Sequence, residues 1–294
     1  MIRSISAVVL FFLMFVSCRP SSNRIVIGSK NFTEQAVLGE LLAQYLESRG
    51  LPVERRFYLA GSYVCDQALL AGRIDLYVEY TGTALTAILK QQPTGDHAAV
   101  YERVKRAYAQ RGIVATEPLG FNNTFAMVVR TDEANKLHLQ TLSDFIPYAP
   151  RSRLGIGYEF MERPDGLHGL ERTYGFRFAE PPRVMDLGLL YRALINKQVN
   201  IIAGSNTDGL IAALNLTVLE DDRHYFPPYD AVPLVRRDTL GRYPALGPAL
   251  ADVGGKITEA DMRQMNYAVD GEHRDTAQVV ADFLRRKRLI SDSR

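Results

Sequence analysis

The chain has 294 residues, of which 47% are apolar and 23% are charged, and its formal net charge at pH 7 is +2. This length is enough for two domains of ordinary size, and the composition is typical of a folded globular protein. A nucleic-acid partner is not expected, because proteins that bind nucleic acid usually have a basic stripe or a high positive charge.

The first residues have the layout of an export signal. Arg3 precedes an uncharged apolar run over residues 5–16, and Ser17 and Cys18 follow it. This run is shorter than the roughly 20 residues that a membrane-spanning helix needs. We therefore predict a secretory signal peptide over residues 1–17, whose removal deletes one Arg and no acid and so lowers the net charge from +2 to +1.

Cys18 follows a small residue at the end of the apolar run, which resembles the bacterial lipobox. That resemblance implies a lipid on Cys18, a tether over residues 18–23, and a membrane-anchored protein outside the cytoplasm, in the periplasm or at the cell surface. Cys65 is then the only remaining cysteine, so no intrachain disulfide is expected in the exported protein. Cys65 lies on the apolar side of a predicted helix, and we interpret it as a core residue.

The next part of the chain alternates between strand and helix patterns. The apolar run at 24–28 predicts a strand, and a helix with an apolar face follows until Gly50, capped by Asn31 or Thr33. Further patterns predict a strand at 53–59, a helix at 63–71 and a strand at 74–78. This order indicates an α/β protein with a mostly parallel sheet flanked by helices, and ligands bind such sheets at the carboxyl ends of strands.

A later segment, residues 192–203, repeats the helix-then-strand pattern of residues 67–78. We interpret this as two lobes of similar build that face each other across a ligand cleft. Residues 119–130 and 224–236 each place aromatic and Asn or Pro residues before a strand, as expected for chain segments that cross between lobes. The predicted division is lobe 1 at 24–120 plus 225–294 and lobe 2 at 121–224.

No pattern in the sequence favours catalysis. The five histidines are scattered without metal-ligand spacing, and no phosphate-binding loop or nucleophile elbow occurs. We therefore predict a protein that is not an enzyme and that holds no metal or cofactor.

Five segments together resemble one family, the substrate-binding proteins of glycine betaine/carnitine/choline ABC transporters. In chain order they are GSKNFTEQ at 28–35, IDLYVEYTGT at 74–83, EFMERPDG at 159–166, TDG at 207–209 and FPPYD at 226–230. The resemblance implies the two-lobed periplasmic-binding-protein fold of type II, which closes on its ligand. It also implies a small quaternary-ammonium ligand and, as partners, the permease and ATPase subunits of an ABC importer.

The resemblance further implies which residues contact the ligand. Tyr80 and Tyr229 match aromatic residues that surround the ammonium group, and Lys30, Thr83 and Arg163 match the polar end that receives a carboxylate. The remaining ligand contacts that it implies are Gln35, Asn123, Phe125 and Ser205. Family members usually have Tyr at the positions of Phe125 and Ser205, so the four-tyrosine cage is incomplete in this chain.

Other interpretations stay open at this point. A larger betaine, such as carnitine or ergothioneine, fits a cage with one wall replaced by Ser205. A sensor lipoprotein without a permease, or an enzyme on the same two-lobed scaffold, are alternatives of a different kind. For Arg163 the alternative is an ion pair with Asp165 or Glu159, and for Asp208 it is hydrogen bonding within its own turn.

Overall fold

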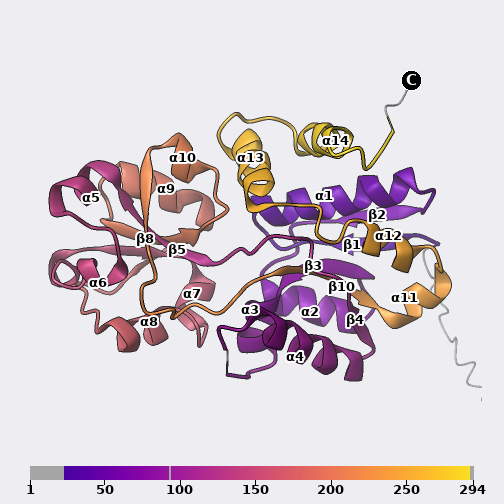
Figure 1. Ribbon diagram of the computed structural model, residues 1–294, viewed down its shortest axis with the longest axis horizontal. Coiled ribbons are helices and arrows are strands. Elements are labelled where there is room, and N and C mark those ends of the chain that lie inside the picture. Colours follow the sequence, from indigo (N-terminus) through magenta and orange to yellow (C-terminus); the bar gives the residue numbers. More distant parts are fainter. Residues whose placement is uncertain (1–22, 93, 292–294) are drawn as a thin grey trace, which may run out of the picture.

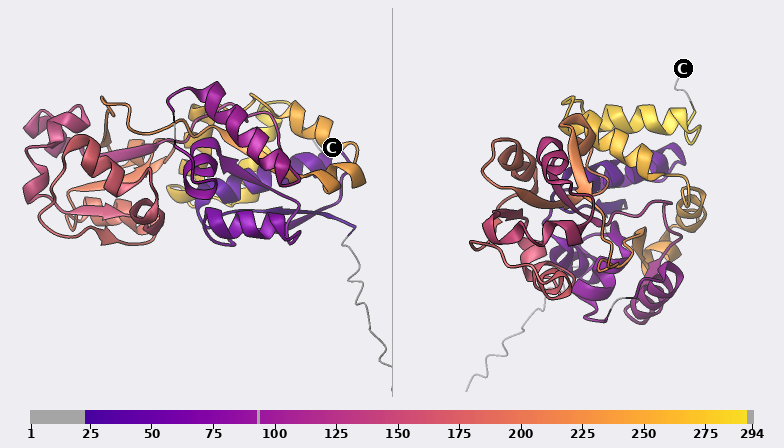
Figure 2. Two further views of the ribbon diagram at one scale, coloured as in Figure 1. Left: turned by 90° about the horizontal axis from the view of Figure 1, so that it is seen from below. Right: turned by 60° about the vertical axis from the view of Figure 1, so that its left-hand side comes forward.

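The computed structural model describes residues 23–92 and 94–291. Figure 1 shows two bodies side by side, each built around its own sheet, and Figure 2 shows the same division from two further directions. The predicted signal peptide and Cys18 lie outside the described residues. None of the helices in the described ranges combines the length and the apolar character needed to cross a bilayer.

Lobe 1 contains a five-stranded sheet with the order β2-β1-β3-β10-β4. Its strands are β1 (Ile25–Gly28), β2 (Val53–Arg56), β3 (Leu76–Tyr80), β4 (Ile113–Ala115) and β10 (Ala231–Arg236). Its helices are α1 (Thr33–Ser48), α2 (Ser62–Leu70), α3 (Thr81–Thr83), the π-helical turn η1 (Ala84–Ile88), α4 (His97–Gln110), α11 (Arg237–Arg242), α12 (Leu246–Asp252), α13 (Glu259–Asp270) and α14 (Thr276–Arg286).

Lobe 2 contains the second five-stranded sheet, with the order β7-β6-β8-β5-β9. Its strands are β5 (Phe125–Arg130), β6 (Leu154–Ile156), β7 (Arg183–Val184), β8 (Ile201–Ser205) and β9 (Leu216–Leu219). Its helices are α5 (Thr131–Leu137), α6 (Leu142–Phe145), the 3-10 turn η2 (Ala149–Arg151), α7 (Tyr158–Glu162), α8 (Leu167–Tyr174), α9 (Leu187–Ile195) and α10 (Leu210–Ala213).

The α/β class and the two-lobed form are confirmed, and the sheets are mostly parallel as expected, with one reversed strand in each: β10 in lobe 1 and β5 in lobe 2. In lobe 1, β1 pairs in parallel with β2 and β3, whereas β10 pairs antiparallel with β3 and β4. Lobe 2 repeats this mixture around β6, β8 and β5. The reason is the direction of entry: β5 and β10 come from the interlobe crossings at the edge where β8 and β3 end, so they run in the opposite direction.

Alternation along the strands explains how each sheet buries both of its faces. In β1, Ile25 and Ile27 belong to the same apolar cluster as the α1 residue Leu38, whereas Val26 belongs to the cluster of Cys65 and α2. Side chains that alternate between faces allow helices to cover both sides of the sheet. Each fully buried aliphatic side chain contributes about 1.5–3 kcal/mol, so the two-sided core holds the strand ends, and the cleft residues after them, in place.

The two crossing segments run side by side between the lobes. Asn122 and Asp230 form an isolated antiparallel bridge just before β5 and β10, and Asn122 Oδ1 accepts the backbone N–H of Tyr229 at 2.6 Å. The two crossings are thus held together between the sheets, and the division of the chain at residues 120/121 and 224/225 stays a prediction. The pairing also fixes the aromatic residues of both crossings at the cleft.

Candidate ligand-binding site

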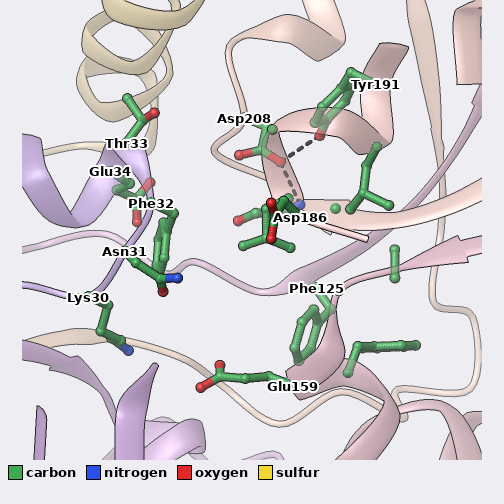
Figure 3. Close-up of a pocket in the computed structure, with 18 of the residues that line it drawn as sticks. Lys30, Asn31, Phe32, Thr33, Glu34, Phe125, Glu159, Asp186, Tyr191 and Asp208 are labelled. Atoms are coloured by element: carbon green, nitrogen blue, oxygen red, sulfur yellow. Dashed lines mark hydrogen bonds between the residues drawn. The ribbon is translucent and has the colours of Figure 1, made fainter. Parts of the chain in front are cut away.

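A cavity of about 760 Å³ lies between the lobes and is lined by residues of both. Figure 3 shows Lys30, Asn31, Phe32, Thr33 and Glu34 on the lobe 1 side and Phe125, Glu159, Asp186, Tyr191 and Asp208 on the lobe 2 side. The volume falls in the range of roughly 300–1,000 Å³ that is usual for small-molecule sites. The cleft that the two-lobed interpretation predicted is therefore large enough for a small organic ligand.

Lys30 follows β1 and is buried at the lobe 1 side of the cavity. Its Nζ lies 2.5 Å from Glu79 Oε1 and 3.2 Å from Ser62 Oγ, and 4.5 Å from the centre of the Tyr80 ring. The charge of Lys30 is thus balanced by Glu79 inside the same lobe. A ligand carboxylate that contacts Lys30 would share it with Glu79.

Glu34 lies in the first turn of α1 and also lines the cavity. Its Oε1 accepts hydrogen bonds from Tyr80 Oη and Asn123 Nδ2, both at 2.5 Å. Its Oε2 accepts one from Asn266 Nδ2 at 2.9 Å. One carboxyl group therefore joins β3, the first crossing and α13.

The predicted caps of α1 are not observed. The N-cap residue is Phe32, which has no side-chain cap, and the Thr33 hydroxyl donates instead to Asp270 Oδ1 at 2.6 Å. The acceptor belongs to α13, which packs beside α1. Tertiary packing thus redirects the hydroxyl away from the turn that precedes the helix.

Aromatic rings from both crossings meet in the cavity. The Phe125 ring centre lies 5.6 Å from that of Tyr229, edge to face, and 4.8 Å from that of Phe160. The Arg163 guanidinium lies 5.0 Å from the Phe125 ring centre and 5.5 Å from that of Tyr229. These rings therefore already have a cation beside them, and Tyr80 has Lys30.

Arg163 links the two lobes beside the rings of Phe125 and Tyr229. Its Nε and Nη2 donate to the two carboxylate oxygens of Asp165 at 2.9 and 2.5 Å. Its Nη1 donates to Thr83 Oγ1 of lobe 1 at 2.8 Å, and Tyr229 Oη donates to Asp165 Oδ2 at 2.6 Å. Burial opposes ionisation of Asp165, yet the charge of Arg163 holds the pKa of Asp165 below its usual value.

Ser205 and Asp208 lie where β8 ends. The Ser205 hydroxyl donates to Asn123 Oδ1. Asp208 Oδ2 accepts the backbone N–H of Ser205 at 2.9 Å and the Tyr191 hydroxyl at 2.5 Å. Burial raises the pKa of Asp208 to about 7, although these two donors oppose the shift. Asp208 thus bonds within its own turn and also lines the cavity.

A second contact between the lobes lies at the rim of the cavity. Glu159 Oε1, from α7 of lobe 2, accepts the backbone N–H of Ser62 at 2.9 Å. Ser62 is the first residue of α2, whose N-cap Gly61 provides no side-chain cap. A Cβ at Gly61 would collide with the side chains of Tyr158 and Glu159. Glu159 therefore places a negative charge at the N-terminus of a helix in the other lobe, where it is stabilising.

Eight of the nine ligand contacts implied by the sequence resemblance line the cavity: Lys30, Tyr80, Thr83, Asn123, Phe125, Arg163, Ser205 and Tyr229. Gln35 is the ninth, and it does not belong to this lining. It is 1% exposed, and its amide atoms find no hydrogen-bond partner in the described part of the chain. Successive helix positions are rotated by about 100°, so the cleft position in this turn belongs to Glu34 rather than to Gln35.

Several cavity residues were not expected from the sequence: Glu34, Tyr158, Glu159, Phe160 and Tyr191 among them. Glu34 lies in the segment GSKNFTEQ, next to the implied ligand contact Gln35. This position was the sequence feature that could have indicated a role for Glu34 in the cavity. Tyr191 is on α9, far from any motif. Within residues 23–92 and 94–291, no group of His, Cys, Asp and Glu side chains is arranged to hold a metal ion.

Comparison with known proteins is consistent with this geometry. The chain is 34% identical over 289 residues to a glycine-betaine-binding protein of Pseudomonas aeruginosa. The aligned region covers 95% of this chain and 93% of that protein. It is 33% identical over 264 residues to the ergothioneine transport permease/ergothioneine binding protein EgtU of Helicobacter pylori, covering 89% of this chain and 47% of that protein.

A solved structure described as a glycine betaine/carnitine/choline ABC transporter superposes with a TM-score of 0.76 at 31% identity, covering 91% of this chain and all of that one. This likeness confirms the predicted type II periplasmic-binding-protein fold. A family model for the substrate binding domain of ABC-type glycine betaine transport systems matches residues 23–286. With nearly all of the described chain inside that match, the protein belongs to this family of transport substrate-binding domains.

Proposed function

We propose that this protein binds a small quaternary-ammonium compound of the glycine betaine, choline or carnitine type in its interlobe cavity, without chemical conversion of the ligand. The observation that supports this most directly is that the rings of Tyr80, Phe125 and Tyr229 line one cavity, together with the polar residues Thr83 and Arg163. The relatives named for glycine betaine binding support the same ligand class.

The aromatic rings suit the ammonium end of such a ligand. A trimethylammonium group has no N–H donor, so a protein attracts it with the negative faces of aromatic rings, each worth about 0.5–2 kcal/mol. Phe125 keeps such a face without a hydroxyl. In the described structure, Lys30 and Arg163 contact these rings, which supports their use as cation-binding surfaces.

The polar residues suit a carboxylate end. Arg163 provides a planar guanidinium, which matches a carboxylate in geometry, and Thr83 Oγ1 lies 2.8 Å from it. Asp165 already contacts two of the guanidinium nitrogens. A betaine carboxylate would therefore join an existing network at Arg163, Thr83 and Lys30 rather than meet a free cation.

Titration calorimetry with glycine betaine, choline, carnitine, proline betaine and ergothioneine tests the proposal. At least one ligand is expected to bind the wild type, and Tyr80→Ala should weaken it by about 1–2 kcal/mol, roughly five- to thirtyfold in Kd. Tyr63→Ala is the matched control, because Tyr63 is 68% exposed on α2 of the same lobe. Absence of binding by every ligand, or equal losses in the two variants, would contradict the proposal.

A larger betaine, such as ergothioneine, is the second candidate. It is favoured by Ser205, a small side chain at a position where the family usually has Tyr, and by the relative named for ergothioneine binding. The hydroxyls and carboxylates nearby, Tyr191 and Asp208 among them, would accept or donate hydrogen bonds to the extra atoms. Tighter binding of ergothioneine than of glycine betaine in the same titrations would select this candidate.

We further propose that the protein acts outside the cytoplasm and delivers its ligand to the permease and ATPase subunits of an ABC importer. Family membership supports this. Uptake of the radiolabelled ligand should fall in cells that lack the gene and return when it is supplied on a plasmid. Unchanged uptake would favour a ligand-sensing lipoprotein instead.

Membrane attachment through Cys18 is also proposed, from the sequence around residues 5–18. Metabolic labelling with a palmitate analogue should mark the wild type and leave Cys18→Ser unmarked. Equal labelling of the two proteins would exclude Cys18 as the lipidated residue.

A further inference from the structure

We infer that Glu34 is a specificity-determining residue, whose negative charge makes the cavity select a cationic head group over a neutral one of the same shape. The inference rests on the proposed function, because it concerns the ammonium end of the ligand. None of the sequence motifs assigned this role to Glu34.

The position of Glu34 suits the role. It is 3% exposed and still lines the cavity, and Figure 3 places it on the lobe 1 side, opposite Asp208. Water screens a charge in such a place poorly, so its attraction for a cation is stronger than at the surface. The two carboxyl oxygens of Glu34 accept hydrogen bonds from Tyr80, Asn123 and Asn266, which hold the carboxyl group in position.

The ion pairs around the cavity do not include Glu34. Lys30 pairs with Glu79, and Arg163 pairs with Asp165. Among residues 23–92 and 94–291, no basic side chain lies within ion-pair distance of Glu34. A cation bound beside Glu34 would therefore supply a counterion, whereas a neutral group there would leave the buried charge of Glu34 without one.

Glu34 also acts through the ring itself. Tyr80 Oη donates to Glu34 Oε1 at 2.5 Å, and a hydroxyl that donates to an anion is polarised, which makes the attached ring more electron-rich. A more negative ring face attracts an ammonium group more strongly. The residue thus strengthens cation binding both directly and through Tyr80.

A purely structural role predicts a different result. By joining β3, the first crossing and α13, Glu34 could serve only to hold the cavity in shape, and its loss would then weaken every ligand equally. Carbon isosteres separate the two roles, since a tert-butyl group has the shape of trimethylammonium without its charge. The pairs are glycine betaine with tert-butylacetate, and choline with dimethylbutanol.

The experiment measures Kd for both members of a pair by calorimetry with wild type, Glu34→Gln and Glu47→Gln. Glu47 is the control, because it lies on α1, pairs with Arg55 and is well exposed. Glu34→Gln should weaken the ammonium ligand by about ten- to a hundredfold and the isostere by less than about threefold. Glu47→Gln should leave both unchanged.

Equal weakening of ammonium ligand and isostere by Glu34→Gln overturns the inference while the proposed function stands. Absence of ammonium binding by the wild type overturns the proposed function and the inference with it. Circular dichroism and thermal unfolding establish that the variants fold. If Glu34→Gln does not fold, Glu34→Asp serves instead, because it withdraws the charge by one methylene. This variant should lower the preference for the ammonium ligand over the isostere by about threefold. An unchanged preference overturns the inference.

Discussion

The two walls of the cavity differ in how firmly their side chains are held. The lobe 1 wall, Lys30, Glu34, Tyr80 and Thr83, is almost fully buried and joined by short hydrogen bonds and an ion pair. On the lobe 2 wall, Phe125, Ser205 and Asp208 are partly exposed, although Phe160, Arg163 and Tyr191 are buried.

The carried-over residues that line the cavity are divided evenly, four on each wall, but both departures from the four-tyrosine cage, Phe125 and Ser205, lie on the lobe 2 wall. A pre-organised wall gives affinity for a class of ligand because little ordering is required on binding. A wall with smaller and more exposed side chains can accommodate ligands of different size and shape. We infer that lobe 1 determines the ligand class and lobe 2 determines which member of the class binds best.

Removing Arg163, which joins the two walls through Thr83, should have the largest effect. Arg163→Ala leaves Asp165 buried without its cation, so the free energy of unfolding should fall by about 3–5 kcal/mol. Any carboxylated betaine that still binds should lose about 2–4 kcal/mol, and choline much less. Chemical denaturation and calorimetry measure the two quantities.

Arg56→Ala provides the control for this experiment, because Arg56 forms an exposed pair with Glu54 and such pairs are worth about 0–1 kcal/mol. Equal loss of affinity for betaine and choline in Arg163→Ala would show that Arg163 acts on the structure of the protein and not on the carboxylate of the ligand.

The lobe 2 wall should respond to pH through Asp208. Burial raises the pKa of Asp208 from 3.8 to about 7, so between these values the folded protein retains a proton that the unfolded chain has released. The stability from this group is therefore complete below about pH 4 and is lost as the pH rises through about 7. Asp208→Asn should remove this part of the pH dependence, which amounts to about 4 kcal/mol at most.

Unfolding free energies measured at several pH values test this expectation. Asp132→Asn is the control, because it removes one carboxyl group from an exposed position. A wild-type slope that Asp208→Asn leaves unchanged would contradict the expected role of Asp208.

Ser205→Tyr should sharpen the comparison by giving lobe 2 the aromatic side chain that the family usually has. Glycine betaine should bind more tightly by up to about 1–2 kcal/mol, the worth of one added ring face in a desolvated site. A bulkier native ligand should bind more weakly, because the ring occupies its space. Calorimetry with both ligands tests this, and unchanged affinities would show that Ser205 does not contact the ligand.

The sequence was sufficient for features that depend on local pattern or on motif. Apolar periodicity was enough to predict the buried strands, helix α1 and the burial of Cys65. The same burial raises the pKa of Cys65 to about 12. Features that depend on spatial neighbours were missed. Strand direction in the mixed sheets depends on where a crossing enters, and the hydroxyl of Thr33 bonds to Asp270, which is 237 residues away.

The cap that Glu159 provides across the rim has a consequence for how motion is detected. The amide of Ser62 at the start of α2 is protected only while α7 of lobe 2 stays in place. Separation of the lobes would expose this amide to solvent and loosen the first turn of the helix. The rate at which Ser62 exchanges its amide hydrogen for deuterium therefore reports how often the two lobes part, in a protein with no added label.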